Sequence, residues 1–300
     1  MGRGIIMNDK RVNRLLNMAW DSQSPSKAIS LARQVLAINP DNTDALIILA
    51  DNRLDDGSLE ELENLLLHAL RSLDDTKNYN DDEHDLLLLS ISYRLAHVYW
   101  TEGRVDDAFS SCEKAMRLLE AEDDVDTYLA HSLRELHYRT MIELEQWQKI
   151  LLLTMKDDTH DLAWAYSRLV AAWVSSQGKS RSVCASMFWD ALIISPDVPF
   201  YMLGYYDEPD DDEENDAFDF ALMYYDIVSV SDDFFRWFTR GTILFGLLTD
   251  RFDGREREYV LDAIDSLGGL EEYEKMSGVL FGADDVSVIE TLAANKCLSN

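Results

Sequence analysis

The sequence predicts an all-α fold made of repeated helical hairpins, and three features of the chain point to it. Hydrophobic residues make up 47% of the 300 residues, enough to bury a substantial core. With only 13 glycines and 5 prolines, the chain has few turn-forming residues, which favours helices over a sheet with many hairpins. Small residues also recur with a period of about 34 residues, which is typical of stacked helical repeats.

The repeat becomes visible when equivalent small residues are aligned along the chain. Ala28 and Ala32 precede INPD at 38–41, and ISPD at 194–197 echoes that phrase later in the chain. The resulting frames are 9–42, 43–76, 89–122, 131–164 and 165–198. The fourth frame is degenerate, because Tyr138 and Glu145 stand where the others carry a small residue and a glycine.

The third frame carries the strongest family signal. Its residues Leu95, Ala96, Tyr99, Gly103 and Ala108 resemble the consensus of the tetratricopeptide repeat (TPR). That resemblance implies a superhelix of antiparallel helix pairs, in which small residues let the paired helices approach closely and stacked repeats share one core. It predicts a TPR superhelix over 9–198 and an acidic helical region over 199–300. An irregular helical bundle with chance alanines is the alternative.

The TPR resemblance also implies a concave groove that binds an extended peptide or helix of another protein. Counting along the first helix of each frame places aromatic and polar residues there, and aromatics with a polar tip are typical interface anchors. The expected groove residues are Trp20, Asp51, Tyr93, His97, Trp100, Arg139, Tyr166 and Trp173. Two alternatives bear on this groove. Asp51 would repel a terminal carboxylate, so a clamp for chaperone C-termini is not expected, and the protein's own C-terminal helices could fill the groove.

A second resemblance begins at PDVPFYMLG, residues 196–204, and extends to Trp237. It is similar to the tail of suppressor-of-tumorigenicity-like TPR proteins and of uncharacterised bacterial relatives, and it implies no known activity. The residues that carry it are Pro196, Val198, Pro199, Tyr201, Met202, Leu203, Gly204, Ala217, Tyr224 and Trp237. Physically, the prolines are expected to hold the chain extended after the last repeat, while the apolar residues cover its open end.

An acidic block follows that phrase, and we expect a solvated loop at 205–216. Its acids are Asp207, Glu208, Asp210, Asp211, Asp212, Glu213, Glu214 and Asp216. The block lacks the glycine and the terminal acid that a calcium loop of the EF-hand type requires. Beyond it, apolar patterns predict helices at 217–230, 233–248, 255–267, 270–281 and 284–295, with Asp232 or Asp233, Asp253 and Asp284 as caps.

Charge restricts the classes of partner. The chain has 27 Lys and Arg against 57 Asp and Glu, a formal net charge of −30. Phosphate backbones and anionic lipid surfaces require basic proteins, so we expect no nucleic acid and no membrane partner. A protein or peptide partner, basic in character, fits better. Three widely spaced cysteines form no disulfide framework and favour a reducing, cytoplasmic setting.

No catalytic, cofactor-binding or metal site is expected, because nucleotide, hydrolase and metalloprotease motifs are missing. Two DDxxD stretches, at 81–85 and 157–161, match a diphosphate-magnesium motif, but each precedes an apolar helix and is explained by helix capping. The main hypothesis is therefore a TPR adaptor. The alternatives are an acidic neutraliser that occupies a cationic site and, least favoured, a magnesium-dependent diphosphate enzyme.

Overall fold

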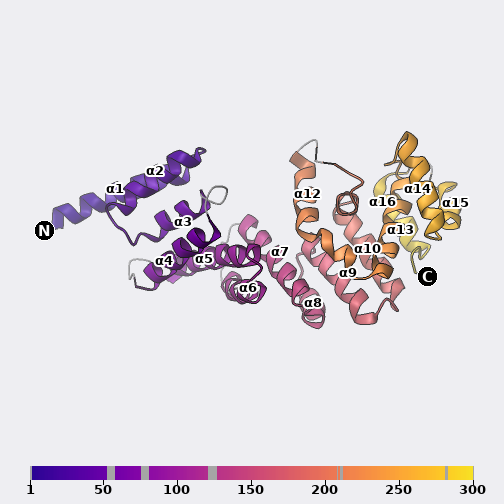
Figure 1. Ribbon diagram of the computed structural model, residues 1–300, viewed down its shortest axis with the longest axis horizontal. Coiled ribbons are helices and arrows are strands. Elements are labelled where there is room, and N and C mark those ends of the chain that lie inside the picture. Colours follow the sequence, from indigo (N-terminus) through magenta and orange to yellow (C-terminus); the bar gives the residue numbers. More distant parts are fainter. Residues whose placement is uncertain are drawn as a thin grey trace. The chain divides into compact units, whose positions relative to one another are not determined.

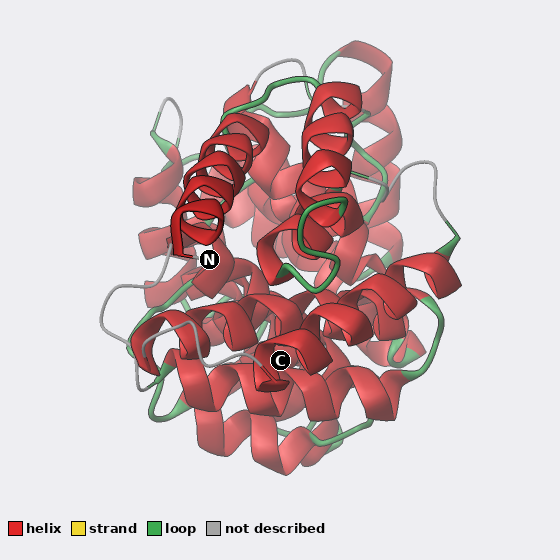
Figure 2. Cartoon of the chain, turned by 90° about the vertical axis from the view of Figure 1, so that its left-hand side faces the viewer, coloured by secondary structure: helices red, strands yellow, loops and turns green. Residues whose placement is uncertain are grey.

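The computed structural model describes residues 2–52, 58–75, 81–120, 127–207, 209, 212–280 and 283–299. Within those ranges the regular structure is entirely helical, with no β-strand (Figure 2). Helices that follow one another pack in pairs, as α1 does with α2 and α3 with α4, so the predicted all-α helical-hairpin fold is confirmed. The chain forms two compact units, Met1–Thr140 and Met141–Asn300.

The first unit is a stack of hairpins in chain order (Figure 1). In it α1 packs on α2, α3 on α4 and α5 on α6, while contacts of α2 with α3 and of α4 with α5 join successive hairpins. Three of the predicted frames thus correspond to these three hairpins. The helices are α1 (Gly2–Trp20), α2 (Pro25–Leu36), α3 (Thr43–Asp51), α4 (Leu59–Asp75), α5 (Asp81–Thr101), α6 (Val105–Leu119) and most of α7 (Thr127–Glu143).

The small residues of the repeat lie where the helices of this unit meet. Ala32, Ala69, Ala96 and Ala108 are all 0% exposed. A methyl side chain lets two helix backbones approach closely, and larger residues such as Leu66 fill the space beside it. The small-residue pattern therefore marks the core contacts of the hairpins.

Local signals explain where the repeat helices begin and end. Asn42 caps α3 by accepting a hydrogen bond from the backbone N–H of Ala45 at 2.9 Å. Gly103 turns the chain between α5 and α6 with φ of 73°, a conformation that favours glycine. At the equivalent turn of the degenerate fourth frame, Glu145 adopts φ of 52° despite its side chain. The missing glycine therefore leaves strained backbone at that turn.

The second unit continues with α9 and α10 and then adds further helices that pack on them. Contacts between α10 and α16, and between α13 and α14, α15 and α16, make one compact body of repeat and C-terminal helices. The predicted boundary at 198/199, between the repeats and the C-terminal region, lies inside this unit. The helices are α8 (Trp147–Thr154), α9 (Leu162–Ser176), α10 (Arg181–Ile194), α11 (Val198–Met202), α12 (Asp212–Tyr224), η1 (Tyr225–Ser229), α13 (Asp232–Leu248), α14 (Gly254–Ser266), α15 (Leu270–Ser277) and α16 (Asp285–Ala294).

The phrase at 196–204 forms a short helix, α11, and not the extended exit chain that its prolines predicted. Pro199 lies in the first turn of α11, where its missing N–H leaves no hydrogen bond broken. Phe200 is 0% exposed and packs against Phe245 and Phe252, with ring centroids 6.2 and 5.7 Å away. A Cβ on Gly246 would lie 2.8 Å from the ring of Phe200, so close packing requires glycine there. The apolar phrase is part of the core of the second unit.

Arg251, just after α13, ties this phrase to the C-terminal helices. Its guanidinium donates hydrogen bonds to Asp197, to the hydroxyl of Tyr206 at 3.0 Å and to Asp285 at 2.5 Å. The same group lies over the ring of Phe200 at 5.4 Å. One partly buried cation thus joins the residue before α11, the segment after it and the start of α16.

Part of the predicted acidic loop is helical. Residues 212–216 lie at the start of α12, so the loop prediction for them is wrong. Asp207 and Asp216 are exposed, and Glu208, Asp210 and Asp211 lie outside the described residues.

The helices predicted after the acidic block are present, and some of their N-cap residues differ from the predicted ones. Asp284 accepts from the backbone N–H of Ser287 at 3.0 Å and caps α16 as predicted. Asp253 holds the N-cap position of α14 without a side-chain hydrogen bond. Helix α13 is capped by Ser231, which accepts from Phe234, and not by Asp232 or Asp233. Those two acids lie instead in its first turn.

Candidate functional site

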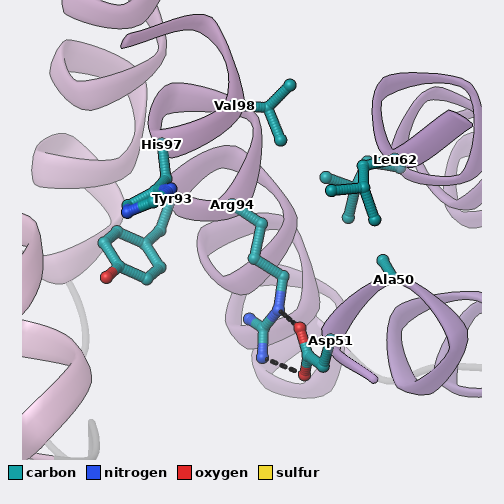
Figure 3. Close-up of a pocket in the computed structure, with 8 residues that line it drawn as sticks. Ala50, Asp51, Leu62, Tyr93, Arg94, His97 and Val98 are labelled. Atoms are coloured by element: carbon teal, nitrogen blue, oxygen red, sulfur yellow. Dashed lines mark hydrogen bonds and ion pairs between the residues drawn. The ribbon is translucent and has the colours of Figure 1, made fainter. Parts of the chain in front are cut away.

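A cavity of about 230 Å³ lies in the first unit between α3, α4 and α5, and we refer to it as the α3–α5 pocket (Figure 3). Its lining is half apolar and half polar, which is typical of ligand sites that combine burial with orientation. The apolar lining consists of Ala50, Leu62, Leu66 and Val98. The polar lining consists of Asp51, Tyr93, Arg94 and His97.

Helical spacing gathers these side chains. On α4, Leu62 and Leu66 are four residues apart and so lie on one face. On α5 the same spacing of four residues puts Arg94 and Val98 on one face, and Tyr93 and His97 on the adjacent one. The pocket therefore opens at the junction of the second and third predicted frames.

An ion pair joins two walls of the pocket. The Nε of Arg94 lies 2.5 Å from one carboxylate oxygen of Asp51, and the second guanidinium nitrogen lies 2.7 Å from the other. The remaining nitrogen donates to the hydroxyl of Ser90 at 2.6 Å and to its carbonyl at 3.1 Å. Figure 3 shows Arg94 extending from α5 to Asp51 at the end of α3. The carboxylate of Asp51 is therefore paired with a cation of the same pocket.

The other two polar residues are neutral at pH 7. Burial raises the pKa of Tyr93, although its hydrogen bond with Ser132 acts in the opposite direction. His97 is exposed to solvent on one side, but the protein around its imidazole removes part of the hydration of the ring. This desolvation disfavours the charged form and lowers the pKa of His97. Its ring nitrogens make no hydrogen bond with the described residues, so they can bind a ligand.

Of the predicted groove residues, the structure brings Asp51, Tyr93 and His97 together in this pocket. Trp100 lies further along α5, half-buried, in an edge-on contact with the ring of His97 at 6.1 Å. Trp20 is 49% exposed at the end of α1 and does not line the pocket.

Arg139 was also predicted to line the groove, but its side chain is not available to a partner. It lies in α7 and is 6% exposed. The neighbouring positions on both sides, Tyr138 and Thr140, are buried as well. Counting along the first helix of a degenerate frame thus placed a core residue in the groove.

Tyr166 and Trp173 are buried by the C-terminal helices, so their assignment to an open groove is wrong. Tyr166 is 0% exposed and packs on Phe220 of α12 with ring centroids 5.4 Å apart. Trp173 is 3% exposed and packs on Phe234 and Trp237 of α13 at 5.2 and 5.0 Å. In the second unit the alternative holds, because the protein's own helices cover these aromatic residues.

Sequence reasoning missed the remaining lining residues of the pocket. Leu62 and Leu66 belong to the second helix of their repeat, whereas only first helices were counted. Arg94 follows a predicted groove residue directly, yet nothing in the sequence links it to Asp51, 43 positions earlier. The arginine that pairs with Asp51 could be found only from the structure.

Metal and nucleophile chemistry has little support among the residues that the structure describes. Within those ranges no group of three or more His, Cys, Asp or Glu could hold a metal ion. Asp161 of the second DDxxD stretch caps α9 by accepting from the N–H of Trp164 at 2.8 Å, as the capping interpretation predicted. Burial raises the pKa of Cys112 to about 12 and that of Cys184 to about 11, which disfavours reactive thiolates.

Part of this chain is similar in sequence to known proteins. No protein-family model matches the chain. A Protein ST7 homolog from Caenorhabditis elegans is 26% identical over 167 residues, which is 51% of this chain and 30% of the relative. A Protein ST7 homolog from Caenorhabditis briggsae is 25% identical over 169 residues, with the same shares. The matched stretch is thus less than a third of these relatives' own length.

None of the helices in the described part of the chain is both long enough and apolar enough to cross a bilayer.

Proposed function

We propose that this chain is a non-enzymatic TPR-type adaptor that binds a peptide segment of another protein in the α3–α5 pocket. The observation that carries the proposal is the pocket itself, which combines an apolar wall with four polar residues at the junction of two repeat hairpins. The agreement of hairpins α1–α2, α3–α4 and α5–α6 with 34-residue TPR frames supports it. Similarity to part of the ST7 homologues supports a helical scaffold.

The setting that we propose for this adaptor is the cytoplasm. All three cysteines are free and buried, and disulfides are rare in reducing compartments. Buried thiols of this kind serve packing and not redox chemistry.

A double variant tests the proposal. Tyr93→Ala with His97→Ala removes two rim side chains while the apolar core below stays intact, so the protein should remain folded. We expect affinity capture from host extract, read by mass spectrometry, to lose a protein that the wild type retains. Tyr259→Ala, which removes an exposed aromatic of the second unit, is the control and should capture that protein unchanged. Identical capture by wild type and double variant would exclude the pocket as the binding site.

An acidic neutraliser is the second candidate, favoured by the charge of the C-terminal third. Residues 197–300 contain 25 acidic and 7 basic residues, a net of −18. Such a protein would hold its partner by charge, and capture would fail at about 0.5 M salt because screening shortens the Debye length to a few ångströms. Capture that persists at that salt concentration favours the adaptor.

A further inference from the structure

The size of the α3–α5 pocket sets what it can hold. Its volume of about 230 Å³ exceeds the roughly 150 Å³ of an apolar cavity that accepts benzene. Leu62, Leu66 and Val98 line this space and belong to the buried core around it. The space therefore fits one side chain of the size of leucine or phenylalanine.

The charge of the pocket sets which side chain is favoured. Arg94 and Asp51 neutralise one another through two hydrogen bonds, and their side chains are only 24% and 26% exposed. His97 and Tyr93 add no charge at pH 7. A charged occupant would lose its hydration and find no unpaired counter-charge, which is costly, whereas an apolar one gains from leaving water.

The surroundings set the charge of the rest of the ligand. Residues 1–140, which make up the first unit, contain 26 acidic and 15 basic residues, and the whole chain carries −30. A field of this sign attracts cationic segments and repels acidic ones. The pocket therefore favours an uncharged side chain, whereas the surface around it favours basic residues on either side of that side chain.

We propose that the α3–α5 pocket receives one uncharged apolar side chain, branched aliphatic or phenyl, from a peptide whose flanking residues are basic. This inference rests on the proposed adaptor function and specifies its ligand. The main chain of the peptide lies across the rim, where each carboxylate oxygen of Asp51 can accept an N–H group beside its bond from Arg94. The free ring nitrogens of His97 offer a second contact for the main chain.

Methyl NMR on the full chain tests this directly. The probes are capped peptides of the pattern Lys-Ser-Ser-X-Ser-Ser-Lys, with X as Leu, Phe, Ser, Asp or Lys. We expect the Leu and Phe peptides to shift the methyl signals of Leu62, Leu66 and Val98, with affinities about tenfold or more above that of the Ser peptide. The Asp and Lys peptides should leave these signals unshifted. Equal shifts from all peptides, or none from Leu and Phe, would overturn the inference.

A cavity-filling variant separates binding in the pocket from binding nearby. Ala50→Leu places an isobutyl group in the pocket and should abolish the shifts, while Ala37→Leu adds the same group at an exposed position of the first unit and should not. Should Ala50→Leu fail to fold, Val98→Ile narrows the pocket by one methylene and should weaken the Phe peptide more than the Leu peptide. Shifts that survive both variants would refute the assignment.

The two proposals fail in different ways. If no peptide shifts the pocket methyls, yet the wild type captures a protein that the Tyr93→Ala, His97→Ala variant loses, the ligand class is wrong and the adaptor function stands. If the Leu and Phe peptides bind as expected, the ligand class is supported even where capture from host extract finds no protein.

Discussion

Replacing Arg251 with alanine should destabilise the second unit by about 3 kcal/mol. The side chain of Arg251 is 16% exposed, and its guanidinium donates to Asp197, Asp285 and Tyr206 at once. Removing one partner of a buried ion pair costs about 3–5 kcal/mol, because the remaining charge stays unpaired. Asp197 and Asp285 are 28% and 39% exposed and recover part of their hydration, so the lower limit of that range applies.

The assay is urea unfolding followed by tryptophan fluorescence, which reports mainly the second unit because most of the tryptophans lie there. The matched control is Arg257→Ala. Arg257 also bonds a carboxylate, that of Asp250 at 2.9 Å, but Asp250 is 89% exposed. An exposed pair of this kind contributes less than about 1 kcal/mol.

The comparison of the two variants decides whether the reasoning is right. A loss at Arg251→Ala that exceeds the loss at Arg257→Ala by about 2 kcal/mol would support a buried junction between α11, the segment after it and α16. Equal losses would refute it, since they would show that burial adds nothing to the contribution of Arg251 to stability. A loss below about 1 kcal/mol at Arg251→Ala would also refute it.

Three further changes follow from the structure. Trp173→Ala should lower the free energy of unfolding by about 3–5 kcal/mol, because it leaves a cavity in a buried aromatic cluster. An unchanged melting temperature would indicate that Trp173 lies in an open groove. Glu145→Gly should raise the melting temperature, a gain of about 0.5–1 kcal/mol, by relieving its positive φ, whereas Gly103→Ala should lower it by about 1 kcal/mol. Cys112 and Cys184 should stay unmodified by a thiol reagent at pH 8 in the folded protein and react after unfolding, since burial holds their pKa values at about 12 and about 11; rapid native labelling would contradict this.

The repeat architecture could be predicted because its causes are local. Ala96 and Ala108 mark close helix contacts, Gly103 marks a turn, and caps such as Asn42 mark helix starts, all within a short stretch of chain. These signals were sufficient for the all-α helical-hairpin class. Three of the four polar residues that line the pocket, Asp51, Tyr93 and His97, were also expected in a groove from their positions in the repeat.

What the sequence could not determine depends on contacts between distant segments. The register that placed Tyr93 in a groove placed Trp173 there equally, because position within a repeat does not show whether another helix covers it. Only the packing of α13 over α9 decided that Trp173 belongs to the core. In the same way, Asp51 has a free charge by sequence and a neutralised one in the fold, because Arg94 reaches it from another helix.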